Sequence, residues 1–140
     1  MSYTKPKNLL NMKLKKITLL VFSLIFYLNL IAQTSIEGIW KGTSICQIEN
    51  SSCHDEQVVY HISKDTRLNN FQVIANKIVD GKEDYMGTLN FIYDAQKETF
   101  ICVDEVRKAR WEFQKKGEQM SGKLIYKNEL YRLVSIKKEN

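Results

Sequence analysis

Short runs in which apolar and polar residues alternate recur from residue 36 to residue 137, and this pattern most restricts what the chain can fold into. The runs are rich in β-branched and aromatic residues, which fit a pleated, half-buried surface. No stretch keeps apolar residues at helical spacing for the ten or twelve residues, roughly, that a helix needs. The pattern predicts eight β-strands, at residues 36–46, 57–63, 71–78, 85–93, 99–104, 109–115, 120–127 and 130–137.

The gaps between these runs are short and have turn chemistry, for example around Gly81 and Gly117. Short turns between successive strands favour antiparallel hairpins. Glycines inside the predicted strands, such as Gly42 and Gly122, allow the sharp bends that strands make as they coil around a barrel. We therefore predict an all-β fold, an eight-stranded, mainly antiparallel up-and-down barrel, with a β-sandwich as the alternative.

The first 32 residues have the order of a secretory signal peptide. Three lysines, Lys13, Lys15 and Lys16, precede an apolar run over 17–32, which ends in the small residue Ala32. This run is shorter than the roughly 20 residues of a membrane-spanning helix. We expect cleavage after Ala32, a single barrel domain over 33–140, and a secreted or periplasmic protein that no longer touches the membrane. Leu30, three positions before the proposed cut, is larger than the ideal small residue, so an uncleaved anchor is the alternative, and Met12 is an alternative start.

The net charge of the chain resides in this leader. The sequence has 21 Lys and Arg against 16 Asp and Glu, and five of the lysines but none of the acidic residues precede Gln33. Residues 33–140 are therefore balanced at 16 of each sign, and the basic excess is no argument for nucleic-acid binding. We expect the cluster of Arg107, Lys108 and Arg110 to form a solvated strand or turn face.

The segment CQIENSSCHDEQVVYH, residues 46–61, holds two of the three cysteines and both histidines. Cysteines of an exported protein are expected to pair, and the turn-forming residues between Cys46 and Cys53 favour a disulfide-closed loop. Cys102, in an apolar run, is expected to be a buried thiol. The alternative is a metal site that also uses His54 and His61, but these two differ in parity and would face opposite sides of an extended strand.

A catalytic centre has less support in the sequence. The serine, histidine and aspartate of SSCHDE are neighbours in the chain, so they cannot face one another as nucleophile, base and orienting group. Neither a phosphate-binding glycine loop nor a nucleophile elbow is present in the sequence. We expect a protein that is no enzyme and uses neither a cofactor nor a metal.

The opening motif GIWKGT, with Gly38 and Trp40, resembles the first strand of lipocalins and other calycin-type barrels. The resemblance implies that an arginine near the barrel's end, here Arg132, lies against Trp40, where a cation over the indole is worth about 0.5–2 kcal/mol. It also implies a cavity for a ligand. The segment from GTSICQ to the second histidine also looks like small exported bacterial proteins of unassigned function.

An eight-stranded barrel is just wide enough to be filled by side chains or to hold one small ligand. We expect five aromatic residues to lie nearest the interior as candidate ligand contacts, with packing alone as the alternative: Tyr85, Phe91, Tyr93, Phe113 and Tyr126. The predicted function is non-catalytic binding of a small, partly apolar molecule. The alternative is an envelope protein-interaction module, such as a protease or lysozyme inhibitor, that inserts residues 47–52 or 115–118 into its partner.

Overall fold

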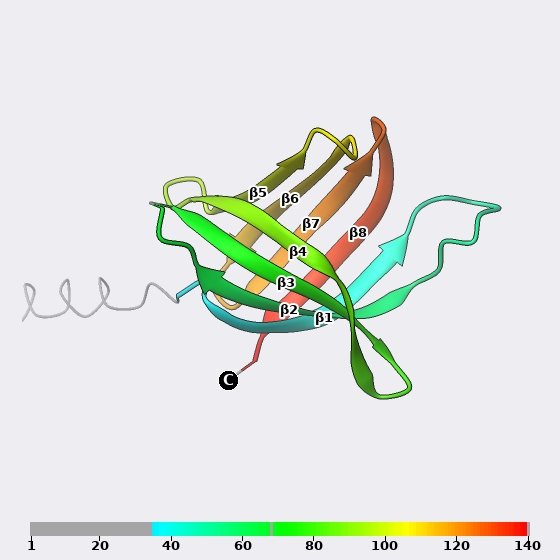
Figure 1. Ribbon diagram of the computed structural model, residues 1–140, viewed down its shortest axis with the longest axis horizontal. Coiled ribbons are helices and arrows are strands. Elements are labelled where there is room, and N and C mark those ends of the chain that lie inside the picture. Colours follow the sequence, from blue (N-terminus) through cyan, green and yellow to red (C-terminus); the bar gives the residue numbers. More distant parts are fainter. Residues whose placement is uncertain (1–34, 68, 140) are drawn as a thin grey trace, which may run out of the picture. The chain divides into compact units, whose positions relative to one another are not determined.

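The computed structural model describes residues 35–67 and 69–139 (Figure 1). These residues form eight strands: β1 (Gly38–Cys46), β2 (Glu56–Lys64), β3 (Asn70–Val79), β4 (Lys82–Asp94), β5 (Thr99–Asp104), β6 (Ala109–Lys116), β7 (Gln119–Tyr126) and β8 (Glu129–Lys138). Each strand runs antiparallel to the next, and β1 pairs with β8 to close the barrel. The predicted up-and-down barrel is confirmed, and its closure excludes the alternative β-sandwich. The architecture is compatible with a lipocalin-like fold. The predicted leader, residues 1–32, lies outside the described residues.

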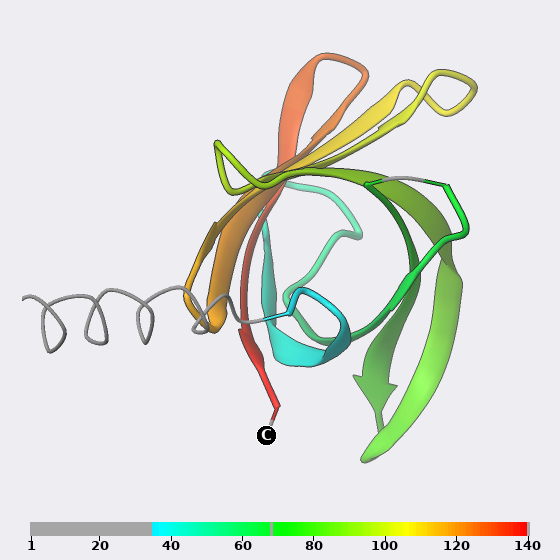
Figure 2. The same cartoon turned by 90° about the vertical axis from the view of Figure 1, so that its left-hand side faces the viewer.

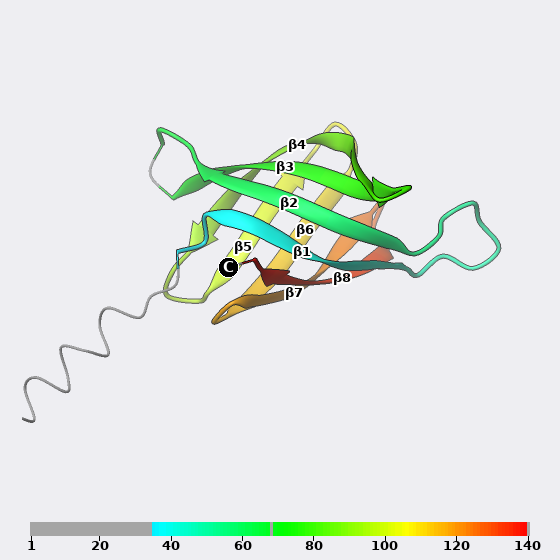
Figure 3. The same cartoon turned by 90° about the horizontal axis from the view of Figure 1, so that it is seen from below.

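Successive strands alternate in direction, so the turns between them lie alternately at the two ends of the barrel (Figures 1 and 3). At the first end β1 begins and β8 finishes, and we name it the N-terminal end. At the opposite end lie the long β1–β2 loop with both predicted disulfide cysteines and the tight β3–β4 and β7–β8 turns. We name it the disulfide end. The described residues include no helix long and apolar enough to cross a membrane.

Aromatic side chains fill the half of the barrel nearer the N-terminal end. Phe91 and Phe100 stack with ring centroids 4.3 Å apart, and Phe113 lies 6.0 Å from Phe91. Trp40 is fully buried in this cluster, and its indole N–H donates a 2.9 Å hydrogen bond to the carbonyl of Ile36. That bond draws the segment before β1 across the barrel opening, where the turn is visible in Figure 2. The N-terminal end is therefore closed by packed side chains.

Two β-bulges break the alternation of inward and outward residues. Between β3 and β4, Ala75 pairs with Gly87 but the next residue of β3 pairs with Tyr85, so Met86 is extra. Between β7 and β8, Leu124 pairs with Arg132 but the next pair skips Tyr131. A bulge turns the residues beyond it to the other face of the sheet. Both bulges lie towards the disulfide end, where they reshape the inner wall.

Gly42 lies where β1 and β8 come closest. A Cβ atom at this position would clash with the carbonyl oxygen of Ser135 and lie 2.8 Å from the Ile136 Cα. Gly42→Ala is therefore expected to lower the free energy of unfolding by about 1–3 kcal/mol in denaturant titrations, because the backbone must move. Ser135→Ala, an exposed position on the facing strand, is the control and should stay within about 0.5 kcal/mol of the natural chain. Equal stabilities of both variants would contradict this close approach.

Candidate ligand-binding site

A cavity of about 340 Å³ lies inside the barrel at its disulfide end. Seven of the eight strands contribute lining residues, and most of these are apolar: Val58, Ala75, Met86, Leu89, Leu124 and Val134, together with Trp111. Ligand cavities in proteins usually measure about 300–1,000 Å³ and combine apolar walls with a few placed polar groups. The volume suits one small molecule.

Arg132 is the central polar residue of this cavity. Its Nη1 donates to the carbonyl and the hydroxyl of Ser44, at 3.3 and 3.2 Å, and to the carbonyl of His54, at 3.2 Å. The same nitrogen lies 3.2 Å from Oε2 of Glu56. Both charged side chains are largely buried, with 12% of Arg132 and 14% of Glu56 exposed. The guanidinium is thus held in one orientation by four acceptors on one nitrogen.

The register of three neighbouring strands brings these groups together. Ser44 of β1 pairs with Glu56 of β2 on one side and with Val134 of β8 on the other, and Arg132 pairs with Cys46. Residues two apart on a strand share a face, so Arg132 points inward like Val134. Glu56 likewise faces the interior with the apolar residues that follow it on β2. An Arg and a Glu therefore enter the barrel from the two strands that flank β1.

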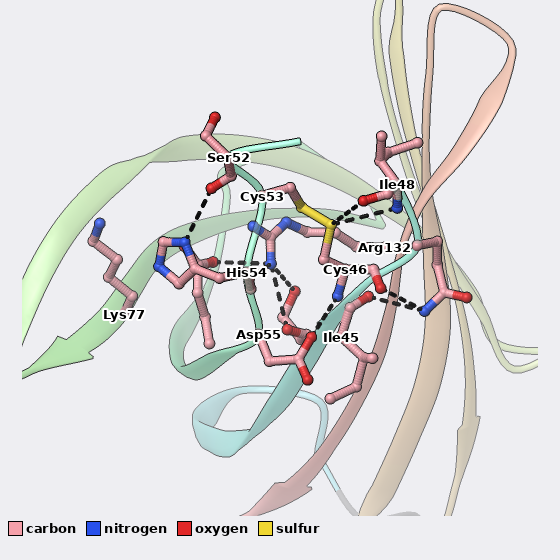
Figure 4. A network of polar contacts seen from close by, with 12 residues as sticks. Ile45, Cys46, Ile48, Ser52, Cys53, His54, Asp55, Lys77 and Arg132 are labelled. Atoms are coloured by element: carbon pink, nitrogen blue, oxygen red, sulfur yellow. Dashed lines mark hydrogen bonds and ion pairs between the residues drawn. A yellow bond between two sulfur atoms is a disulfide. The ribbon is translucent and has the colours of Figure 1, made fainter. Parts of the chain in front are cut away.

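The β1–β2 loop lies beside Arg132 at the rim of the barrel (Figure 4). A disulfide joins Cys46 to Cys53 across a Cα–Cα distance of 5.9 Å, which confirms the predicted pairing. The carboxylate of Asp55 accepts a 2.9 Å hydrogen bond from the backbone N–H of Cys46. The backbone carbonyl of His54, between Cys53 and Asp55, accepts a hydrogen bond from Arg132. The loop is therefore fixed to the barrel by the disulfide and by hydrogen bonds from the backbone and from a side chain.

Tyr60 extends the polar side of the cavity along β2. Its side chain lines the cavity and only 7% of it is exposed. Burial raises the pKa of the phenol to about 12, with the charges of Arg132 and Glu56 acting in opposite directions. The hydroxyl therefore keeps its proton at neutral pH and can donate a hydrogen bond.

Arg107 and Trp111 complete the lining near the rim. Arg107 is 70% exposed and pairs with Asp104 at 3.0 Å in the β5–β6 turn. Arg110, which the sequence groups with it, pairs instead with Glu112 on the strand surface. The basic cluster is therefore divided between a solvated strand face, as predicted, and the cavity mouth.

Replacing both Cys46 and Cys53 by serine is expected to lower the free energy of unfolding by about 2.5 kcal/mol, because the bridge closes a short loop in the unfolded chain. Denaturant titration measures the loss, with Ser52→Ala in the same loop as the control. Alkylation in denaturant without reduction should label only Cys102, which is buried and unpaired. Three labelled cysteines, or a loss below about 0.5 kcal/mol, would contradict the bridge.

The structure separates the five aromatic residues predicted to contact a ligand, and none of them lines the cavity. Phe91 and Phe113 are buried in the cluster beneath it. Tyr93 is half-buried against the same cluster, near the N-terminal end. The interior positions predicted for Tyr85 and Tyr126 are wrong, since they are 63% and 37% exposed. The β4 bulge turns Tyr85 outward, whereas Tyr126 lies at the last residue of β7, where it packs on Tyr131 at the rim.

The predicted contact between Arg132 and Trp40 is also wrong. Trp40 pairs with Lys138 at one end of β1, whereas Arg132 pairs with Cys46 at the other. Six residues of strand separate these positions, roughly 20 Å. The guanidinium instead lies 5.6 Å from the ring centroid of Tyr131, the residue released by the β8 bulge.

The two histidines lie apart and hold no common site. The ring of His54 is exposed, with Nδ1 3.2 Å from the Ser52 carbonyl oxygen. His61 lies on the outer wall, 2.6 Å from Glu83, which also accepts from Asn76. These two hydrogen bonds lower the pKa of Glu83. Within residues 35–67 and 69–139, no three His, Cys, Asp or Glu side chains gather as metal ligands would.

Four polar residues of the cavity lining are not among those predicted from the sequence: Ser44, Glu56, Tyr60 and Arg107. A signal for three of them existed. Glu56 and Tyr60 share parity with Val58, and Ser44 shares parity with Trp40, so alternation alone places them inside the barrel. No comparable signal marks Arg107, which lies in a turn. Comparisons with models of protein families, with curated proteins and with solved structures yield no match for this chain.

Proposed function

We propose that this protein is an exported, non-catalytic, lipocalin-like binding protein that holds one small, partly apolar molecule in the cavity at its disulfide end. The observation that carries the proposal is a barrel packed at one end and hollow at the other, with an apolar wall and a few fixed polar groups at the hollow end. Burial of a ligand's apolar surface against such a wall stabilises the complex, while the polar groups orient the ligand.

The polar groups of the cavity support binding more than chemistry. The carboxylate of Glu56 is neutralised by Arg132, and the Ser44 hydroxyl accepts a hydrogen bond from the same guanidinium. Export is part of the proposal. The signal peptide pattern over 1–32 supports it, and the Cys46–Cys53 disulfide is consistent with an oxidising compartment.

Binding of N-phenyl-1-naphthylamine, an uncharged apolar dye that brightens in apolar surroundings, tests the proposal. The natural chain should bind it saturably. Ala75→Leu should weaken binding at least about tenfold, because Ala75 is 6% exposed and a larger side chain would occupy the cavity. Ile74→Leu, the adjacent residue on the outer face, is the matched control and should bind like the natural chain. Absence of saturable binding, or equal binding by Ala75→Leu, would overturn the proposal.

A second candidate is an envelope protein-interaction module. The observation that favours it is the β1–β2 loop, which extends beyond the barrel in Figures 1 and 3 and exposes residues 49–52 while a disulfide holds its base. Immobilised protein should then retain one dominant protein from envelope extract. Replacing residues 49–52 with glycine and serine should abolish that retention without changing dye binding. Retention by both forms would reject the loop as the contact.

A further inference from the structure

The guanidinium of Arg132 is held on one nitrogen and open on the rest. All four of its close polar contacts, to Ser44, His54 and Glu56, are made by Nη1. Nε and Nη2 have no hydrogen-bond partner among the described residues, yet neither is sealed from the cavity by surrounding atoms. The Nε–Nη2 edge presents two parallel N–H donors, the geometry that accepts both oxygens of a carboxylate.

A second donor without a partner faces the same space. The hydroxyl of Tyr60 forms no hydrogen bond with any described residue, although the side chain is more than nine-tenths buried. The hydroxyl is not among the fully buried polar atoms without a partner, so a small molecule in the cavity can reach it and accept its hydrogen bond. Tyr60 and Arg132 thus both offer donors, and the ligand must bring acceptors.

The charges around the cavity allow an anion. Two guanidiniums, Arg132 and Arg107, and one carboxylate, Glu56, belong to the lining, while Asp104 pairs with Arg107 in the turn outside it. Oε2 of Glu56 contacts Nη1 of Arg132 and leaves the Nε–Nη2 edge open to a ligand. Glu56 therefore orients the guanidinium, and a second carboxylate on the open edge would share the positive charge.

We infer that the ligand is a monocarboxylate with a compact apolar body. Its carboxylate accepts from the open edge of Arg132 and from the hydroxyl of Tyr60, and its body lies against the apolar wall formed by Val58, Leu124 and Val134. This inference rests on the proposed function and adds the chemical class of the ligand to it. A neutral amide of the same length would match the shape but offer one acceptor oxygen.

Calorimetric titration of the natural chain with octanoate, octanamide and octan-1-ol at neutral pH tests this inference. These probes share one alkyl chain and differ in the head group. Octanoate should bind at least about tenfold more tightly than either neutral probe, a difference of about 1.4 kcal/mol. Equal or weaker binding of octanoate, or no measurable heat from it, would overturn the inference. If N-phenyl-1-naphthylamine still binds in that case, the proposed function stands and only the ligand class fails.

Two variants assign the preference to named atoms. Arg132→Lys keeps a positive charge but removes the parallel donors, so the ratio of octanoate to octanamide affinity should fall severalfold. Tyr60→Phe removes only the hydroxyl, so the same ratio of affinities should fall severalfold. Lys137→Gln, which removes a cation from an exposed position of the same strand, β8, is the control and should leave the ratio unaltered. A natural ratio in both Arg132→Lys and Tyr60→Phe, each checked for folding by its thermal transition, would overturn the assignment.

Discussion

Replacing Trp40 by alanine is expected to lower the free energy of unfolding by about 3–5 kcal/mol, the usual cost of removing a large buried aromatic side chain. The indole has no exposed surface and belongs to the aromatic cluster that closes the N-terminal end. Its N–H is bonded to the carbonyl of Ile36, so the substitution also releases the segment that crosses the opening. The loss is measured by denaturant titration with two independent probes.

Trp40→Phe separates packing from the hydrogen bond. Phenylalanine retains part of the ring contacts but cannot donate to Ile36, so its loss should lie between those of the natural chain and the alanine variant. Ile39→Ala is a matched control, because Ile39 precedes Trp40 on β1 and its side chain lies on the outer wall, 36% exposed. A loss below about 1 kcal/mol in Trp40→Ala would mean that the end of the barrel is closed by other contacts.

The fold could be predicted because each strand carries its own alternation of inward and outward residues. The β5 strand spans the predicted residues 99–104, and the other strands differ from prediction by only a few residues at their ends. Alternation fails where the backbone gains a residue. Met86 is extra on β4 and Tyr131 on β8, and a bulge of this kind depends on pairing with a distant strand rather than on local sequence. For this reason Tyr85 was assigned to the wrong face.

The site could be predicted only in part. Position 46 pairs with 53 as loop chemistry indicates, and parity alone could have placed Glu56 and Arg132 in the interior. What parity cannot give is the height of a residue along the barrel axis, which the register between β1 and β8 determines. The resemblance to lipocalins implied that Arg132 lies near Trp40, because it contained no information about the register between β1 and β8. Arg107 is a further case, because it reaches the cavity from a turn.

Breaking the ion pair at the cavity should have the second large effect. Arg132→Met is expected to lower the free energy of unfolding by about 2–4 kcal/mol. This is slightly less than the cost of breaking a fully buried pair, because 12–14% of these side chains is exposed. The substitution keeps an unbranched side chain in place but leaves the Glu56 carboxylate and the His54 carbonyl without their donor. Denaturant titration measures the loss.

A double variant distinguishes a lost attraction from a stranded charge. In Arg132→Met with Glu56→Gln the carboxylate is gone, so the remaining loss should be well below the sum of the two single losses, with a coupling of at least about 1 kcal/mol. Lys137→Met, on the outer face of the same strand, controls for the removal of a cation and should have an effect within about 0.5 kcal/mol. Additive losses would mean that Glu56 and Arg132 act independently. The open edge of the guanidinium would then lack the partner that orients it towards a ligand.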